Sequence, residues 1–224
     1  MRTVQCCGVV VLALASVCSA EFVPCKTISG SAVEQYGEVT IQRIRFLEPA
    51  EEVDATVLLP NSDVPVPGIV FSHSAILGTN GSVDLRQFAW ALARAGAASI
   101  ILDGTIDWQV PNDDSARAPH LMACAGQWLL LHAKLDLHRL AHAGPTRHWG
   151  GNDAPFCLPG EVPCWQPGPW LNFGLTSPAE LHNTERMLTH EGQLSMAQFA
   201  ERTLHLKEVN PEWLLSAPEG MFGR

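Results

Sequence analysis

Four histidines lie close together in the chain and are the first candidates for metal chemistry. Imidazole is the commonest protein ligand for zinc and copper, and His138 and His142 are predicted to share one face of a strand. The other two are His132, which falls in a predicted helix, and His148. No carboxylate or cysteine joins the four at a recognised ligand spacing. The sequence therefore predicts no metal site and no other cofactor.

The N-terminus has the pattern of a secretory signal. Residues 1–20 contain one charged residue, Arg2, followed by an apolar run. The small residues Cys18-Ser19-Ala20 at its end suit cleavage by signal peptidase. The apolar run is too short to cross about 30 Å of hydrocarbon comfortably. The pattern predicts a secreted or periplasmic protein with no membrane span after cleavage. An uncleaved anchor is the alternative.

Export would leave four of the seven cysteines in an oxidising compartment. They are Cys25, Cys124, Cys157 and Cys164. Cys157 and Cys164 share one loop rich in proline and glycine, so we favour a disulfide between them. Cys124 falls in an apolar helical pattern, where a long-range disulfide and a buried free thiol both agree with the sequence.

The composition excludes several classes of protein. Lys and Arg number 14 against 23 Asp and Glu, a net charge of −9, which argues against a basic surface that binds nucleic acid. Hydrophobic residues make up 46% of the chain and charged residues 17%, unlike a disordered acidic chain or a coiled coil. We therefore expect one globular domain over residues 21–224.

Residues 38–143 alternate between strand and helix patterns. The predicted strands lie at 39–46, 55–59, 68–71, 98–102 and 139–143. Apolar residues at helical spacing predict a helix over 85–92, with Gly96 as its C-terminal glycine, and a second helix over 119–129. Single crossovers between such elements imply a parallel sheet with helices on both faces.

The rest of the chain lacks such strand patterns. Between residues 144 and 169 there are six prolines and five glycines, which predicts an irregular loop over 144–175. Two helices are expected within 177–209, starting at the capping boxes of Ser177 and Ser195. The second helix is predicted to bury Phe199, Thr203 and Leu206.

Four motifs follow one another in residues 66–151. They are Pro67-Gly68-Ile69-Val70-Phe71-Ser72-His73-Ser74, Leu92-Ala93-Arg94-Ala95-Gly96, Ile100-Ile101-Leu102-Asp103-Gly104 and Asp136-Leu137-His138-Arg139. In this order they resemble the α/β-hydrolase superfamily, in the direction of dienelactone hydrolases and secreted acyl esterases. The resemblance implies a truncated α/β-hydrolase-like fold, with a mostly parallel sheet flanked by helices, an irregular loop and C-terminal helices.

The resemblance also implies a hydrolytic triad, at positions that depart from the family pattern. The family elbow is Gly-x-Ser-x-Gly, whereas this chain has Gly144-Pro145-Thr146-Arg147-His148, with Thr146 at the nucleophile position. The family histidine precedes the final helix, where His190 stands. An acid such as Asp153 or Glu191 would complete the set of nucleophile, base and orienting group. The alternative is a vestigial elbow whose threonine only caps the loop.

Other polar residues fall where the resemblance places the rim of the pocket. His73 and Ser74 occupy the oxyanion loop, with Ser74 in place of the family glycine. Asp103 ends a strand before a long excursion, and His148 replaces the second glycine of the elbow. Ligands bind at this edge of open α/β sheets, so all four are pocket candidates. His73 and Asp103 are equally explained as ordinary strand-end residues.

Two functions agree with these features. The first is a secreted carboxylic-ester hydrolase that acts on a small-molecule ester. The second is a catalytically inactive pseudohydrolase that binds a ligand or partner in the same crevice, because a β-branched residue beside Pro145 fits a strained elbow poorly. The aromatic residues of the irregular loop suit an aryl or sugar ligand, or hold the loop together. An unpaired sheet edge would also allow a homodimer.

Overall fold

The computed structural model describes residues 26–47, 52–72, 75–78, 81–103, 105–106, 117–144, 171–172 and 189–218. The strands of the main sheet are β1 (Lys26–Tyr36), β2 (Val39–Leu47), β3 (Glu52–Pro60), β4 (Val66–Phe71), β7 (Ala98–Leu102), β9 (Leu135–Gly144) and β10 (Leu171–Asn172). They lie in the order β1-β2-β3-β7-β4-β9-β10. A small second sheet contains β5 (Ala75–Gly78), β6 (Gly81–Asp84) and β8 (Thr105–Ile106), in the order β6-β5-β8.

The main sheet is parallel on one side and antiparallel on the other. β4 pairs in parallel with β7 and with β9, and β9 pairs in parallel with β10. β1, β2 and β3 are joined by antiparallel pairing, and β3 is antiparallel to β7. The carboxyl ends of β4, β7 and β9 therefore meet at one edge of the sheet, the carboxyl edge. Their amino ends meet at the opposite, amino edge.

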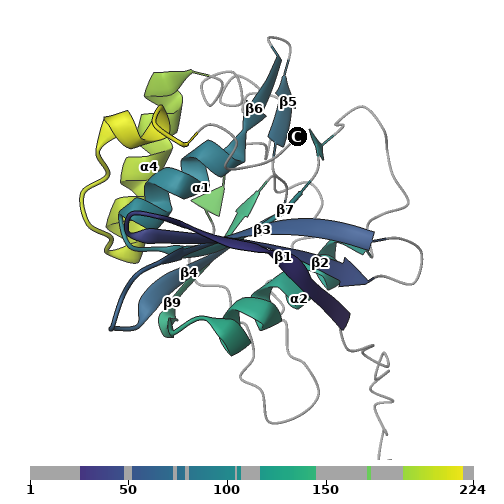
Figure 1. Ribbon diagram of the computed structural model, residues 1–224. Coiled ribbons are helices and arrows are strands. Elements are labelled where there is room, and N and C mark those ends of the chain that lie inside the picture. Colours follow the sequence, from purple (N-terminus) through teal and green to yellow (C-terminus); the bar gives the residue numbers. More distant parts are fainter. Residues whose placement is uncertain are drawn as a thin grey trace, which may run out of the picture.

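Helices cover both faces of this sheet (Figure 1). α1 (Leu85–Arg94), α4 (His190–Leu204) and the 3-10 helix η3 (Pro211–Leu214) lie on one face, and α2 (Arg117–His132) lies on the other. Side chains alternate between the two cores, so that Phe71 of β4 belongs to the α1 core and Val70 to the α2 core. All residues of β4 and β7 are buried, which explains why both are apolar except for Ser99 of β7. The predicted α/β class with helices on both faces is confirmed.

α1 forms where the apolar spacing predicted it. The predicted core residues Leu85, Phe88, Ala89 and Leu92 are all buried. At its N-terminus the Asp84 carboxylate accepts a hydrogen bond from the Arg86 backbone N–H at 2.9 Å. Just past its C-terminus, Gly96 has a φ of +105°, which residues with a side chain rarely adopt. The predicted terminal glycine is therefore confirmed.

α2 also buries its predicted face. That face consists of Leu121, Ala125, Trp128 and Leu129. Cys124 lies on the same helix, where it is buried and disulfide-bonded rather than free. All the other cysteines, including the predicted pair Cys157 and Cys164, lie outside the described residues.

Residues 136–139 form a turn-like irregularity inside β9. The register of β9 against β4 shifts at this point. The Asp136 carboxylate accepts a hydrogen bond from Arg139 Nε at 2.6 Å. The rest of the Arg139 guanidinium points at the carbonyl oxygens of Pro65 and Leu204, each 3.4 Å away. Arg139 therefore ties the start of β4 to the end of α4.

α4 begins earlier than the sequence predicted and buries a different face. Its first residue is His190, and the Thr189 hydroxyl caps it by accepting the Gly192 N–H at 3.1 Å. The predicted start at Ser195 is therefore wrong, because Thr189 supplies the same capping chemistry one and a half turns earlier. The buried residues are Ala197, Ala200 and Leu204, whereas Phe199 is 38% exposed and Thr203 and Leu206 are half-buried. The small side chains of Ala197 and Ala200 let α4 lie close to α1.

Several segments differ from the predictions, and several others lie outside the described residues. β1, the second sheet and β10 were not predicted, and β10 falls within the predicted irregular loop 144–175. The rest of that loop, the predicted helix at Ser177 and residues 1–20 lie outside the described residues. In the part of the chain that the structure describes, no helix is long and apolar enough to cross a membrane. The single domain over 21–224 stays a prediction.

Candidate active site

The carboxyl edge brings together the ends of β4, β7, β9 and β10. Phe71, the last residue of β4, pairs with Ala143 of β9, and the Ser72 N–H donates to the Ala143 carbonyl oxygen at 3.0 Å. Gly144 ends β9 and pairs with the last residue of β10. The chain therefore enters residues 145–151, which hold the predicted elbow, from this edge, with β4 on one side and β10 on the other.

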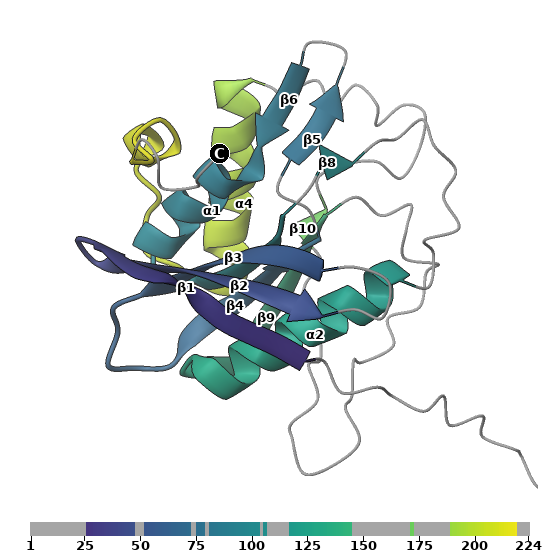
Figure 2. The same ribbon diagram turned by 45° about the vertical axis from the view of Figure 1, so that its right-hand side comes forward.

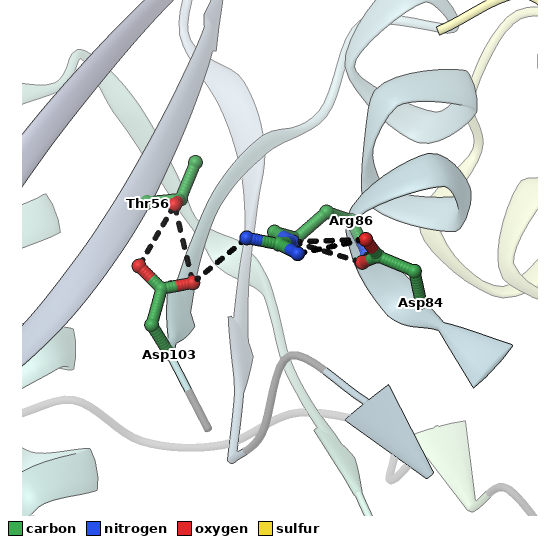
Figure 3. Close-up of polar contacts among 4 residues, drawn as sticks. All are labelled: Thr56, Asp84, Arg86 and Asp103. Carbon is green, nitrogen blue, oxygen red and sulfur yellow. Dashed lines mark hydrogen bonds and ion pairs between the residues drawn. The ribbon is translucent and has the colours of Figure 1, made fainter. Parts of the chain in front are cut away.

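A polar network of four side chains lies beside the carboxyl edge (Figure 3). The Thr56 hydroxyl of β3 donates to the Asp103 carboxylate, 2.9 Å from Oδ2 and 3.2 Å from Oδ1. The Arg86 guanidinium lies 3.8 Å from Asp103 Oδ1 and 2.8 Å from Asp84 Oδ2. Arg86 thus bridges two carboxylates. The network joins β3, the end of β7 and the first turn of α1.

Asp103 is held firmly by this network. Burial is the strongest influence on its carboxyl group and raises its pKa above the ordinary value, while the Thr56 hydrogen bond and the Arg86 charge act in the opposite direction. The pKa of Arg86 is raised, chiefly by its hydrogen bond with Asp84. The Thr56 hydroxyl contacts both Asp103 oxygens, so the network ties the end of β7 to β3, and the role of Asp103 as a pocket residue stays a prediction.

Replacement of Asp84 by alanine is expected to lower the free energy of unfolding by about 1.5 kcal/mol. The change removes the N-cap of α1 and one of the two carboxylates around Arg86. Urea denaturation at pH 7 measures the effect. Gln87→Ala, an exposed position on the same helix, is the matched control and should change stability by less than about 0.5 kcal/mol. Equal effects of the two variants would show that the network contributes nothing.

Ser72 lies at the same edge, directly after β4. It is 5% exposed, and its Oγ has no hydrogen-bond partner within the described residues. Most buried hydroxyl groups in folded proteins are paired, so an unpaired one marks a place for a ligand or water atom. This hydroxyl stands at the base of the predicted oxyanion loop.

α4 directs His190 toward the carboxyl edge. The far end of α4 lies at the amino edge, where the Lys207 N–H donates to the Ala95 carbonyl oxygen at 3.1 Å. A helix of 15 residues is about 22 Å long, so its first turn reaches toward the opposite edge. Figure 2 shows α4 beside α1 with its first turn on the side of β6. His190 is the exposed first residue of this helix, not part of a loop before it as predicted.

The other candidate residues lie outside the described part of the chain. They are His73, Ser74, Thr146, His148 and Asp153. Of the candidates, the structure therefore describes Asp103, His190 and the alternative acid Glu191, which is exposed on α4 directly after His190. The triad of Thr146, His190 and Asp153 stays a prediction.

No protein-family profile and no curated protein matches this sequence. Acetyl xylan esterase 1 from a Thermoanaerobacterium species matches 55% of this chain and 45% of its own, at 13% identity and a TM-score of 0.35. The glucuronoyl esterase from Solibacter usitatus matches 54% of this chain and 45% of its own, at 13% identity and a TM-score of 0.37. A thermostable esterase from Pseudomonas putida matches 50% of this chain and 36% of its own, at 22% identity and a TM-score of 0.33. The chain spans less than half the length of each of these enzymes.

The elements expected from the sequence resemblance follow one another in the structure. β4 leads through α1 to β7, which ends at Asp103, and then come α2, the turn at 136–139 and β9. β7, β4 and β9 are neighbours in one parallel array, covered by helices on both faces. In the arrangement of these elements, the described residues have an α/β-hydrolase-like fold. In an α/β-hydrolase the nucleophile stands at a strand-to-helix turn at the top of the sheet, which here is the carboxyl edge.

Three members of the polar network of this α/β-hydrolase-like chain were missed in the sequence. A signal existed for Asp84, because an aspartate directly before an apolar helical pattern is a common N-cap. Thr56 and Arg86 gave no signal. The contact of Thr56 with Asp103 spans 47 residues and exists because β3 lies next to β7 in the sheet, a neighbourhood that local spacing does not encode.

The predicted strand face shared by His138 and His142 does not form. His138 is exposed in the turn of β9, whereas His142 is 1% exposed and lies on the α2 side of the sheet with Leu140. His132 is on α2, with its ring stacked on Trp128 at 4.3 Å between centroids. Within the described ranges, no three side chains of the metal-ligating types form a group.

Proposed function

We propose that the chain is an exported carboxylic-ester hydrolase whose active site lies at the carboxyl edge of the sheet. The position of Gly144 supports this proposal most strongly. β9 carries the chain to the tips of β4 and β10 immediately before the predicted elbow. This is where an α/β-hydrolase presents its nucleophile.

The proposed reaction is acyl transfer through threonine. The Thr146 hydroxyl attacks the ester carbonyl carbon while His190 accepts its proton, and Asp153 orients the imidazole. Backbone N–H groups at 73–74 stabilise the negative charge on the carbonyl oxygen. His190 then gives the proton to the departing alcohol. Water, deprotonated by His190, cleaves the acyl-threonine to release the acid and restore Thr146.

The described part of the edge supplies two supports for this chemistry. The network of Thr56, Arg86 and Asp103 fixes the end of β7 against α1, which holds the rim of the site in place. The unpaired Ser72 hydroxyl offers a polar contact to a bound ester. The substrate class proposed is a small ester with an aryl or sugar group, because several tryptophans follow the elbow in the sequence.

The purified protein is expected to hydrolyse p-nitrophenyl acetate, and Thr146→Ala and His190→Ala are each expected to reduce kcat/KM at least about 100-fold. Nitrophenolate release measures the rate. Thr203→Ala on α4 and His138→Ala on β9 remove the same side-chain types elsewhere and should keep the wild-type rate. Turnover that is absent in the wild type, or unchanged in both site variants, removes these assignments.

A fluorophosphonate probe gives an independent test of the nucleophile. The Thr146 oxygen would displace fluoride and form a bond to phosphorus, so peptide mass spectrometry should locate the label on that residue. His190→Ala should slow the labelling. A label on another hydroxyl would move the nucleophile to that position.

Ligand binding without turnover is the second candidate function. It is favoured by the sequence of the elbow, where Pro145 and His148 replace the small flanking residues that a sharp turn needs. In this case the wild-type protein binds nitrophenyl esters saturably, releases no nitrophenolate and takes up no fluorophosphonate.

A further inference from the structure

A cavity of about 190 Å³ lies at the amino edge, at the opposite ends of the strands from the proposed active site. Its walls are the turn between β3 and β4, the C-terminal end of α1 and the segment that follows α4. We call it the amino-edge cavity. At about 30 Å³ per molecule it has room for roughly six waters, the volume of a small organic molecule.

The side chains around this cavity are mainly basic, whereas the chain as a whole is acidic. Arg94, Arg139 and Lys207 line the cavity, and among the residues that the structure describes Glu38 is the one acidic lining residue. The chain as a whole has 14 Lys and Arg against 23 Asp and Glu. Even with Arg139 bound to Asp136, Arg94 and Lys207 outnumber Glu38 among the described lining residues, which gives a local positive surface that concentrates anions.

The Arg94 guanidinium is held in place without an acidic partner. It lies 4.7 Å from the ring centroid of Trp213 and 5.7 Å from that of Trp90, so two indole faces fix its position. No carboxylate pairs with Arg94 or Lys207 among the described residues. By contrast, Arg139 is bound to Asp136. Arg94 and Lys207 are therefore the two charges available to a ligand.

Neutralisation of the nearby helix ends does not account for these two cations. Basic residues often compensate the free carbonyl groups of a helix C-terminus. At the end of α1, however, the carbonyl groups of residues 91–93 accept backbone N–H groups of residues 95–97, and Ala95 accepts the Lys207 N–H. At the end of α4, the carbonyl groups of Leu204 and His205 face Arg139. These carbonyl groups are satisfied without the Arg94 or Lys207 side chains.

We propose that the amino-edge cavity binds a small molecule through an oxyanion group, a carboxylate or a phosphate. Arg94 supplies a planar guanidinium held by two indole rings, and Lys207 supplies an exposed second charge. Pro65 and Pro67 form an apolar wall for the body of the ligand. The amino-edge cavity is separate from the proposed ester-hydrolase site. Anion binding in the cavity and ester turnover at the carboxyl edge are therefore tested independently.

Isothermal titration of the full chain with sodium phosphate, and separately with sodium benzoate, tests the proposal at constant ionic strength. At least one of the two is expected to bind saturably at one site. Arg94→Gln and Lys207→Gln should each weaken that binding at least about 10-fold. Binding of phosphate alone, or of benzoate alone, identifies which oxyanion the cavity takes.

Arg202→Gln is the matched control, because Arg202 is exposed on α4 and does not line the cavity. It should bind like the wild type. Lys207 is exposed, so its replacement keeps the test valid even where loss of Arg94 disturbs the fold. The proposal is overturned if neither anion binds the wild-type protein, or if Lys207→Gln and Arg202→Gln bind equally well.

Discussion

A His142→Leu variant is expected to lose most of the acid sensitivity of folding that the wild-type protein shows between about pH 6.5 and about pH 4. His142 lies on β9, between β4 and β10, and is 1% exposed. Burial lowers its pKa from 6.5 to about 4, because a charged imidazole is poorly solvated there. The folded protein therefore keeps this side chain neutral in moderate acid.

The direction of the effect follows from where the protons bind. Above about pH 6.5 the imidazole is neutral in both the folded and the unfolded state, and it does not change the balance between them. Between about pH 6.5 and about pH 4 the His142 imidazole binds a proton in the unfolded state but stays neutral in the folded state. The free energy of unfolding therefore falls as the pH falls. A difference of about 2.5 pKa units corresponds to a loss of about 3 kcal/mol, complete below about pH 4.

Urea denaturation of the wild type and of His142→Leu at pH 7, 6, 5 and 4 measures this difference. The slope of stability against pH is the readout, so a change in baseline stability of the variant does not affect the conclusion. Asp103 acts in the opposite direction, because its raised pKa lets the folded state bind a proton more readily in acid. It is present in both proteins and cancels in the comparison. His138→Leu, which replaces an exposed histidine, should keep the wild-type slope, and a parallel slope for His142→Leu would contradict the prediction.

The elements that the sequence predicted correctly are those whose burial pattern is set by the strand or helix itself. β4 and β7 are buried at every position and almost wholly apolar because both faces are covered, and α1 repeats its apolar residues at the helical spacing. The glycine after α1 is required by its positive φ. Such signals lie within a few residues of one another, so they are readable without knowing the neighbours.

The failures have a different physical origin. Thr189 and Ser195 are both good N-caps, and in the structure the turn before Ser195 packs Leu194 against the α1 core. The side chains that bind Asp103 come from β3 and α1, and they meet because β7 inserts between β3 and β4. Tertiary neighbourhood decides both cases. Local propensity does not contain that information.

Phe71→Ala is expected to lower the free energy of unfolding by about 4 kcal/mol. Phe71 is completely buried at the end of β4 and packs edge-on against Phe88 of α1, with 6.1 Å between the ring centroids. The substitution removes this aromatic pair and leaves a cavity between the sheet and α1. Thermal unfolding followed by circular dichroism measures the loss, and for a domain of this size the midpoint should fall by about 10 °C.

Phe199→Ala is the control, because Phe199 on α4 is 38% exposed and its loss should cost less than about 1 kcal/mol. The comparison also bears on the proposed active site. Phe71 directly precedes Ser72 and pairs with Ala143, so the packing that it provides fixes the strand tips from which residues 73–74 and 145–151 depart. Ester turnover of the folded Phe71→Ala protein should therefore fall even at temperatures where it is fully native, whereas Phe199→Ala should not affect turnover. A strongly destabilised Phe71→Ala protein that keeps wild-type turnover would show that the reacting groups do not depend on the carboxyl edge, and the location proposed for the site would be wrong.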